Sequence, residues 1–167
     1  MRVKVAAVCC RCYEAETSAN AAAATASTRA AGRRAYAHRI NRKVYVTLNT
    51  LLKETELAEA ADIAAALADM GPDAVIVQDL GLVHMLRNCF PTLKLHGSTQ
   101  MGLHNSAGAA YAKSIGLSRI ILERQVTFEE LTAIRKNTDM ELEMFVHGAL
   151  CCGRSGACLF SSWLGGW

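Results

Sequence analysis

Short apolar runs alternate with longer amphipathic segments over residues 43–147 of this chain. The intervals between the runs, roughly 20 to 30 residues, leave room for a helix in each connection and predict parallel strands joined by right-handed crossovers. Five runs rich in β-branched and large apolar residues are predicted to be strands: Lys43–Asn49, Ala74–Asp79, Leu93–His96, Arg119–Glu123 and Glu141–His147.

Helices are predicted between these strands, at about 53–70, 82–88, 106–115 and 127–137. The first has the clearest pattern, because one helical stripe carries Leu57, Ala60, Ala64, Leu67 and Met70. Gly71-Pro72-Asp73 follows and is a stop signal. The last begins with Thr127-Phe-Glu-Glu130, the sequence of a capping box.

An open doubly wound sheet and a segment of a (β/α) barrel both satisfy this order of elements. Polar residues favour the barrel, because they fall at the carboxyl ends of successive strands, where such a barrel gathers its active site. They are Asn49, Gln78, Asp79, His96, the Ser98-Thr99-Gln100 loop, Glu123 and His147. Eight strands take about 250 residues. We therefore predict an α/β fold: an incomplete (β/α) TIM-type barrel with about five parallel strands and alternating helices.

Composition describes one soluble globular domain, with 167 residues, 51% of them hydrophobic and 20% charged. No window contains the roughly 18 consecutive apolar residues of a membrane span, and the first residues have too short an apolar run for a secretory signal. We therefore expect no membrane association and a cytoplasmic location.

Charge is uneven along the chain, since residues 1–53 hold ten Lys and Arg against two acidic residues. This excess lies in the segment least expected to fold, so charge gives no support to nucleic-acid binding. Residues 1–34 are predicted to be a low-complexity leader, helical or unfolded, with an organelle presequence and an incorrect reading frame or start as alternatives. Residues 35–167 are predicted to form the barrel domain.

Seven cysteines form two clusters with Cys89 alone between them, which argues against a secreted disulfide framework. Cys89 follows an apolar helical stretch and is expected to be a buried, small apolar side chain. Cys9 and Cys12 could complete a metal site with Cys151 and Cys158, but nothing in the sequence brings the leader to that place.

Candidate acid and base residues are His96 and His147, which each end a strand, and Glu123 and Glu143. A histidine bonded to a neighbouring loop is an equally good interpretation of either imidazole. Glu141 and Glu143 lie two apart and are predicted to share a strand face. Gln100 is a further candidate from the loop after the third strand. The catalytic residues are otherwise open, with Cys151 and His147 as a weaker nucleophile and base pair.

Five motifs in order along the chain closely resemble peptidase family U32, the collagenase-like group of peptidases of unassigned catalytic type. The resemblance covers about 35–166, whereas residues 1–34 do not resemble the family. The motifs are Val44–Leu51, Val75–Gly81, Leu95–Met101, Asn105–Gly108 and Phe145–Cys151.

The resemblance implies a barrel-type catalytic domain and activity as a peptidase, a hydrolase that cleaves proteins. In some members it implies a [4Fe–4S] iron-sulfur cluster used in oxygen-independent hydroxylation of RNA bases or of ubiquinone precursors. It places two cluster thiolates at Cys151 and Cys158 and expects the other two beyond Trp167, so that cluster binding by this chain alone is doubtful.

Three hypotheses follow. The first is proteolysis by a U32-type peptidase. The second is an iron-sulfur protein that supports hydroxylation of tRNA or rRNA bases or of ubiquinone precursors. The third is a non-catalytic fragment that associates with itself through open barrel edges. The substrate, peptide or RNA, is left open by the sequence.

Overall fold

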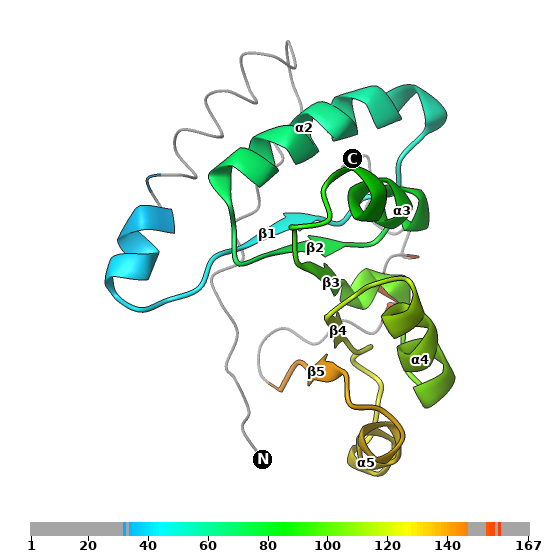
Figure 1. The fold of residues 1–167 in the computed structure, drawn as a ribbon. Coiled ribbons are helices and arrows are strands. Elements are labelled where there is room, and N and C mark those ends of the chain that lie inside the picture. Colours follow the sequence, from blue (N-terminus) through cyan, green and yellow to red (C-terminus); the bar gives the residue numbers. More distant parts are fainter. Residues whose placement is uncertain (1–31, 33, 147–152, 156, 158–167) are drawn as a thin grey trace. The chain divides into compact units, whose positions relative to one another are not determined.

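A computed structural model describes residues 32, 34–146, 153–155 and 157. The chain divides into two compact units, Met1–Leu95 and His96–Trp167. Within the described residues, five short parallel strands form a sheet in their order along the chain, helices alternate with them, and the sheet does not close (Figure 1). The predicted fold class, an incomplete barrel of this type, is confirmed.

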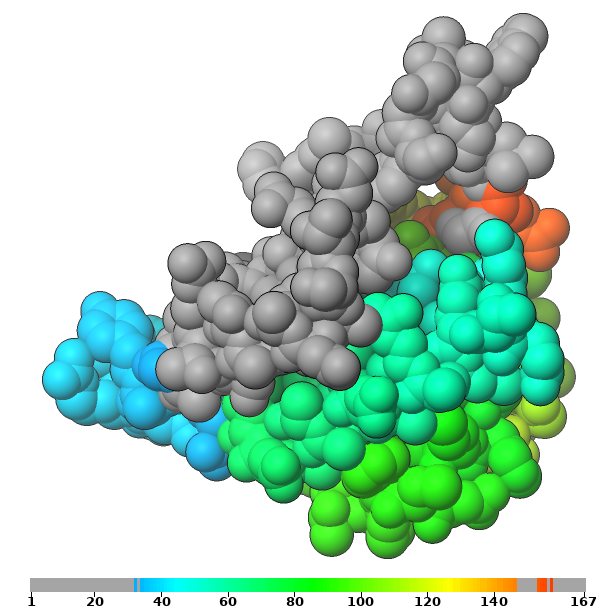
Figure 2. Space-filling view, turned by 90° about the horizontal axis from the view of Figure 1, so that it is seen from above, coloured from blue at the N-terminus to red at the C-terminus, as the bar shows by residue number. Residues whose placement is uncertain are grey.

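The first unit contains β1 (Tyr45–Leu48), the 3₁₀ turn η1 (Glu54–Glu56), α2 (Leu57–Met70), β2 (Ala74–Val77) and α3 (Leu80–Cys89). β1 pairs with β2 in parallel, with Tyr45 opposite Ala74. The core lies around β2, whose Val75 and Val77 are completely buried, and against α3, which contributes Leu82 and Leu86. In the space-filling view, α2 and α3 lie side by side on the surface of this unit (Figure 2).

The stripe predicted for α2 is confirmed at its centre and end, where Ala60, Ala64 and Met70 are buried. Gly71 ends the helix in the left-handed conformation, with φ of 63°, and its amide donates to the carbonyl of Leu67 at 2.9 Å. A residue without a β-carbon takes this conformation at no steric cost, so the predicted stop has a direct physical cause.

Asp73 fastens the turn before β2 to the start of β1. Its Oδ2 accepts from the amide of Val44 at 2.7 Å and lies 2.8 Å from Nε2 of His38. Burial raises the pKa of Asp73, but the hydrogen bonds from Val44 and His38, with the charges of His38 and Lys43, outweigh it and leave the pKa lowered.

The second unit begins within β3 (Leu95–Gly97) and continues through the 3₁₀ turn η2 (Thr99–Met101), α4 (Ser106–Ser114), β4 (Arg119–Ile121), α5 (Phe128–Lys136) and β5 (Glu141–Glu143). The capping box predicted for α5 is confirmed. The amide of Glu130 donates to Thr127 Oγ1 at 3.2 Å, and the amide of Thr127 donates to Glu130 Oε2 at 2.8 Å.

Several predictions differ from the structure, in the bounds of the strands and in the burial of one thiol. β4 ends before Glu123, whose amide donates to the carbonyl of Leu103 at 3.0 Å and so leaves the ladder. β1, β2 and β5 also end before their predicted last residues. Cys89 is exposed, so the prediction of a buried thiol was wrong. It continues the stripe of Leu82 and Leu86, but as the last residue of α3 it lies past the packed part of the helix. Among the described residues, no helix is long and apolar enough to cross a membrane.

Candidate functional site

Glu123 is a buried carboxylate just beyond the carboxyl end of β4, with 5% of its surface exposed. Both of its oxygens accept backbone hydrogen bonds. Oε1 accepts from the amide of Ser155 at 3.1 Å, and Oε2 accepts from the amide of Arg124 at 3.2 Å. A carboxylate is an acceptor with several lone pairs, so these two amides offset part of the cost of removing it from water.

The segment Gly153–Ser155 therefore packs against the end of β4. The Ser155 hydroxyl is buried and has no hydrogen-bond partner within the described part of the chain. A β-carbon at Gly102, in the turn after β3, would lie 3.9 Å from Nη2 of Arg154. The turns that follow β3 and β4 and the segment Gly153–Ser155 thus meet at one edge of this unit, the edge where a parallel α/β sheet binds its ligands.

The loop after β3 is tied to β4 by a buried hydroxyl, since Thr99 Oγ1 donates to the carbonyl of Leu122 at 3.2 Å. The Gln100 amide donates to Ser98 Oγ at 3.2 Å, which fixes the start of η2. Oε1 of Gln100 is buried and has no hydrogen-bond partner among the described residues. Gln100 can therefore offer an acceptor to a donor group that enters this region.

His96, Arg119 and Glu141 lie side by side on three neighbouring strands, because β3 and β4 pair His96 with Arg119, and β4 and β5 pair Arg119 with Glu141. Register partners in a parallel sheet point to one face. Arg119 is buried and donates to Glu141 Oε2 from Nη2 at 2.6 Å and from Nε at 2.9 Å. Its Nη1 donates to Glu143 Oε2 at 3.0 Å. The prediction that Glu141 and Glu143 share a face is confirmed.

Glu143 thus forms an ion pair with Arg119. His96 is buried on the strand beside Arg119. These positions place Glu143, His96, Glu123 and Gln100 in one unit of the chain. They assign no catalytic role to any of the four, and those roles remain predictions. His147, Cys151 and Cys158 lie outside the described residues, so the roles predicted for them also remain predictions.

Asp79, a polar residue at a strand end of the first unit, has structural partners. Asp79 caps α3, with Oδ1 accepting from the amide of Leu82 at 2.8 Å and Oδ2 accepting from the amide of Leu52 at 3.3 Å. Its carboxylate therefore orders the start of a helix and the loop after β1. Gln78, one residue before it, is half-buried.

Sequence reasoning missed a pair of side chains at the carboxyl ends of β4 and β5. Cζ of Arg124 lies 4.9 Å from the centroid of the Phe145 ring, a cation–π contact. The sequence contains a signal for this pair. Phe145 continues the spacing of two residues set by Glu141 and Glu143, and Arg124 directly follows Glu123, the predicted end of the neighbouring strand.

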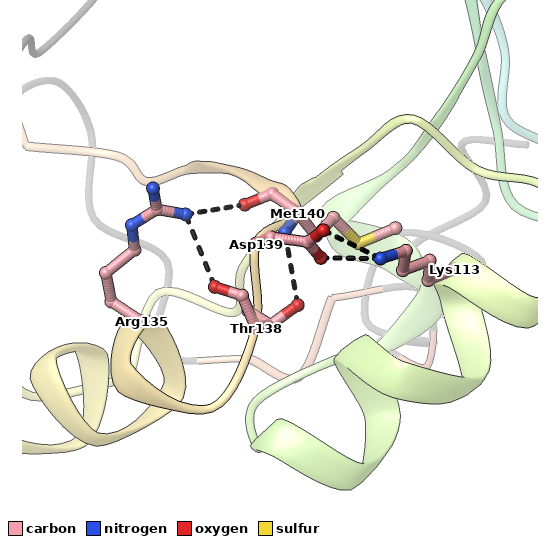
Figure 3. Close-up of polar contacts among 5 residues, drawn as sticks. All are labelled: Lys113, Arg135, Thr138, Asp139 and Met140. Carbon is pink, nitrogen blue, oxygen red and sulfur yellow. Dashed lines mark hydrogen bonds and ion pairs between the residues drawn. The ribbon is translucent and has the colours of Figure 1, made fainter.

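A shallow cavity lies between the last turns of α4 and α5 and the turn that leads into β5. Figure 3 shows the polar contacts around it. Lys113 Nζ binds both oxygens of Asp139 at 2.6 and 2.8 Å, which lowers the pKa of Asp139. Arg135 Nη1 donates to the carbonyls of Thr138 at 3.4 Å and Met140 at 3.1 Å. These two cations hold the turn into β5, so we interpret this cavity as structural.

No group of three or more His, Cys, Asp or Glu side chains within the described residues could hold a metal ion. The thiols predicted as cluster ligands, Cys151 and Cys158, stand on either side of Gly153–Ser155 in the sequence. Thiolates are the ligands that iron-sulfur clusters use, and four complete a cluster. The donor chemistry of these two thiols therefore fits such a cluster in kind, and their role as ligands remains a prediction.

Comparison with known proteins gives a family match and several relatives. The model of peptidase family U32 matches residues 17–167. The chain is 38% identical over 126 residues to a 23S rRNA 5-hydroxycytidine synthase of Escherichia coli, covering 75% of this chain and 19% of that protein. It is 39% identical over 129 residues to the tRNA hydroxylation protein P of the same organism, covering 77% and 28%.

A protein of Methanocaldococcus jannaschii named an uncharacterized protease is 39% identical over 136 residues, covering 78% of this chain and 33% of that protein. The solved structure of a U32 peptidase matches with a TM-score of 0.60 and 19% identity, covering 70% of this chain and 51% of that one, which supports the fold. The chain spans a third or less of the length of these curated relatives.

Proposed function

The chain belongs to peptidase family U32, and from that membership we propose that it is part of a protein that supports hydroxylation of bases in tRNA or rRNA. The observation that carries the proposal is the identity of 38% and 39%, over three quarters of this chain, to relatives named for rRNA and tRNA hydroxylation. Proteolysis is supported by the family name and by one relative described as an uncharacterized protease. RNA modification is therefore the better supported of the two functions.

Among the described candidate residues, Glu123 has a structural role. Peptide hydrolysis needs an activated nucleophile with a base, or a metal with an activated water. Glu123 is the buried carboxylate at the carboxyl edge of the second unit. It accepts hydrogen bonds from two backbone amides and so holds the neighbouring backbone in place.

We propose further that Cys151 and Cys158 supply two thiolates to an iron-sulfur cluster, with the other ligands outside this chain. When bound, such a cluster supplies electron transfer. In this arrangement Glu123 holds Gly153–Ser155, which lies between the two thiols in the sequence. Gln100 offers a buried acceptor on the neighbouring loop.

A chimera tests the function. The aligned segment of the Escherichia coli tRNA hydroxylation protein P is replaced by residues 35–167 and expressed in a strain that lacks this protein. Mass spectrometry of tRNA nucleosides is expected to show a nucleoside that has regained one oxygen atom, whereas a Cys151→Ala chimera is expected to leave tRNA unmodified. A soluble chimera that restores no hydroxylation but cleaves denatured collagen would support proteolysis instead.

The cluster is tested separately by metal analysis of the same chimera, purified without oxygen. Cys151→Ala and Cys158→Ala are each expected to lower iron content and visible absorption, because each removes one of four thiolates. Cys89→Ala is the matched control, since Cys89 is an exposed thiol on α3. Equal iron content in all three variants would remove Cys151 and Cys158 as ligands.

A further inference from the structure

An aromatic ring and a guanidinium stand together at the carboxyl ends of two adjacent strands of the second unit. Phe145 lies two residues beyond β5, and Arg124 lies directly after Glu123 at the end of β4. Arg124 Cζ is 4.9 Å from the Phe145 centroid. Phe145 is 43% exposed and Val146, beside it in the chain, is 68% exposed. Seven other large apolar side chains among the described residues are exposed as well, so Phe145 is singled out by the guanidinium beside its ring rather than by exposure alone.

The charge around this pair is positive. Arg154, on the segment held by Glu123, is exposed, and no carboxylate among the described residues forms an ion pair with Arg124 or Arg154. The acids nearby in the fold are already engaged. Glu123 is buried with both oxygens accepting from amides, and Glu143 is paired with Arg119. The surface therefore combines an exposed aromatic ring that is stacked with Arg124 and two guanidiniums that have no carboxylate partner among the described residues.

We infer that Arg124 and Phe145 form a platform on which an unpaired base of an RNA substrate stacks. The inference rests on the proposed RNA hydroxylation and names how the substrate is held. Proteins that recognise single-stranded RNA stack unpaired bases on aromatic rings and on guanidinium planes, with further cations along the phosphates. An enzyme that modifies a base ring must also take that base out of its stack. An aromatic ring beside a cation provides the surface such a base needs.

An unfolded peptide could also place an apolar side chain on Phe145. The two guanidiniums have no carboxylate partner in the part of the chain that the structure describes, and they favour a polyanion over a neutral peptide, because attraction to phosphates supplies a large share of the affinity for nucleic acid. Binding of an unfolded peptide to Phe145 is therefore treated as one outcome of the test.

The test is binding of a fluorescein-labelled single-stranded oligoribonucleotide to the full chain, followed by fluorescence anisotropy. Phe145→Leu keeps apolar bulk but removes the π face, and is expected to weaken binding about tenfold. Phe145→Tyr is expected to bind as tightly as the unchanged chain. Tyr111→Leu is the matched control, because Tyr111 on α4 is an exposed aromatic away from the carboxyl ends of the strands, and it is expected to have no effect.

Arg124 is tested by the salt dependence of the same binding. Arg124→Ala is expected to weaken binding and to reduce the slope of log affinity against log salt by about one, as loss of one phosphate contact does. Arg124→Lys is expected to keep the slope and to lose part of the affinity, because an ammonium group has no plane to stack. Circular dichroism confirms that each variant is folded.

The inference is overturned if folded Phe145→Leu and Arg124→Ala chains bind the oligoribonucleotide as tightly as the unchanged chain. It is also overturned if a labelled unfolded peptide binds in a Phe145-dependent way and the oligoribonucleotide does not bind. Failure of the proposed function is seen separately. It would appear as RNA binding that depends on Phe145 together with a chimera that restores no hydroxylated nucleoside.

Discussion

At the scale of single residues, Glu123 decides how the segment Gly153–Ser155 is held. A buried carboxylate without partners would be costly, and two backbone amides supply the partners. Hydrogen bonds to a charged group each contribute about 1.5 to 3 kcal/mol. We therefore predict that Glu123→Ala makes the Ser155 amide exchange its hydrogen about tenfold faster, measured by hydrogen–deuterium exchange with mass spectrometry.

Two variants sharpen this prediction. Glu123→Gln keeps one acceptor oxygen in place and is expected to give exchange intermediate between Glu123→Ala and the unchanged chain. Glu129→Ala removes a carboxylate from the exposed first turn of α5 and is expected to leave Ser155 exchange unchanged. Unaltered exchange in Glu123→Ala would show that the segment is held by other contacts.

Asp73 is a second single residue with a testable effect, in this case on how the stability of the chain depends on pH. The pKa of Asp73 is lowered in the folded chain, so the folded state binds its proton less readily than the unfolded state, whose value is near 3.8. A lowered pKa gives stability that is present above the unfolded value and is lost as pH falls through the folded one. We predict that urea midpoints fall between about pH 5 and pH 3, and that Asp73→Asn reduces this fall.

Asp62→Asn, at an exposed position of α2, controls for the loss of a carboxylate as such. The contact of Asp73 with Val44 and His38 joins residues that are 29 and 35 positions away in the sequence. Equal pH dependence in the Asp73→Asn and unchanged chains would mean that this contact does not form in solution.

At the scale of elements, α5 tests whether local sequence sets a helix start. Thr127 and Glu130 exchange hydrogen bonds with each other's amides, which satisfies donors that the first turn leaves open. Thr127→Ala is predicted to lower the free energy of unfolding by about 1 kcal/mol, measured with urea. Thr132→Ala, on the exposed side of the same helix, is the control and is expected to change it by less than about 0.5 kcal/mol.

The difference between local signals and contacts distant in the sequence explains which elements could be predicted from sequence. The capping box and the Gly71 stop are local signals, and both occur where the pattern places them. The end of β4 is set instead by the amide of Glu123 bonding to Leu103, twenty residues earlier in the chain, and no local pattern contains that partner. The prediction of a buried Cys89 fails for a similar reason. Helical spacing shows which side of α3 carries the residue, but not how far along the helix the core covers that side.

For the candidate site, alternation along the strand was sufficient to put Glu141 and Glu143 on one face. It could not show that Arg119 lies between the two carboxylates, because that depends on the register of β4 against β5. The pairing of Arg124 with Phe145 likewise joins two strand ends whose approach follows from the sheet.

At the scale of the whole molecule, the sheet ends at β1 and β5 within the described residues. All four residues of β1 are half-buried, whereas three of the four in β2 are buried, as expected for an end strand beside an inner one. An end strand presents unpaired backbone donors and acceptors, which favour pairing with another chain. We therefore predict that the isolated chain associates with itself, so that its apparent mass in sedimentation velocity rises with concentration.

A charge on the end strand should weaken this association, since lysine at an edge opposes pairing between strands. Thr47→Lys in β1 is expected to lower the apparent mass at high concentration. Thr132→Lys makes the same change on the exposed surface of α5 and is expected to have no such effect. A single monomeric species at every concentration would mean that the edge is covered in the isolated chain. Equal association in both lysine variants would place the contact elsewhere than β1.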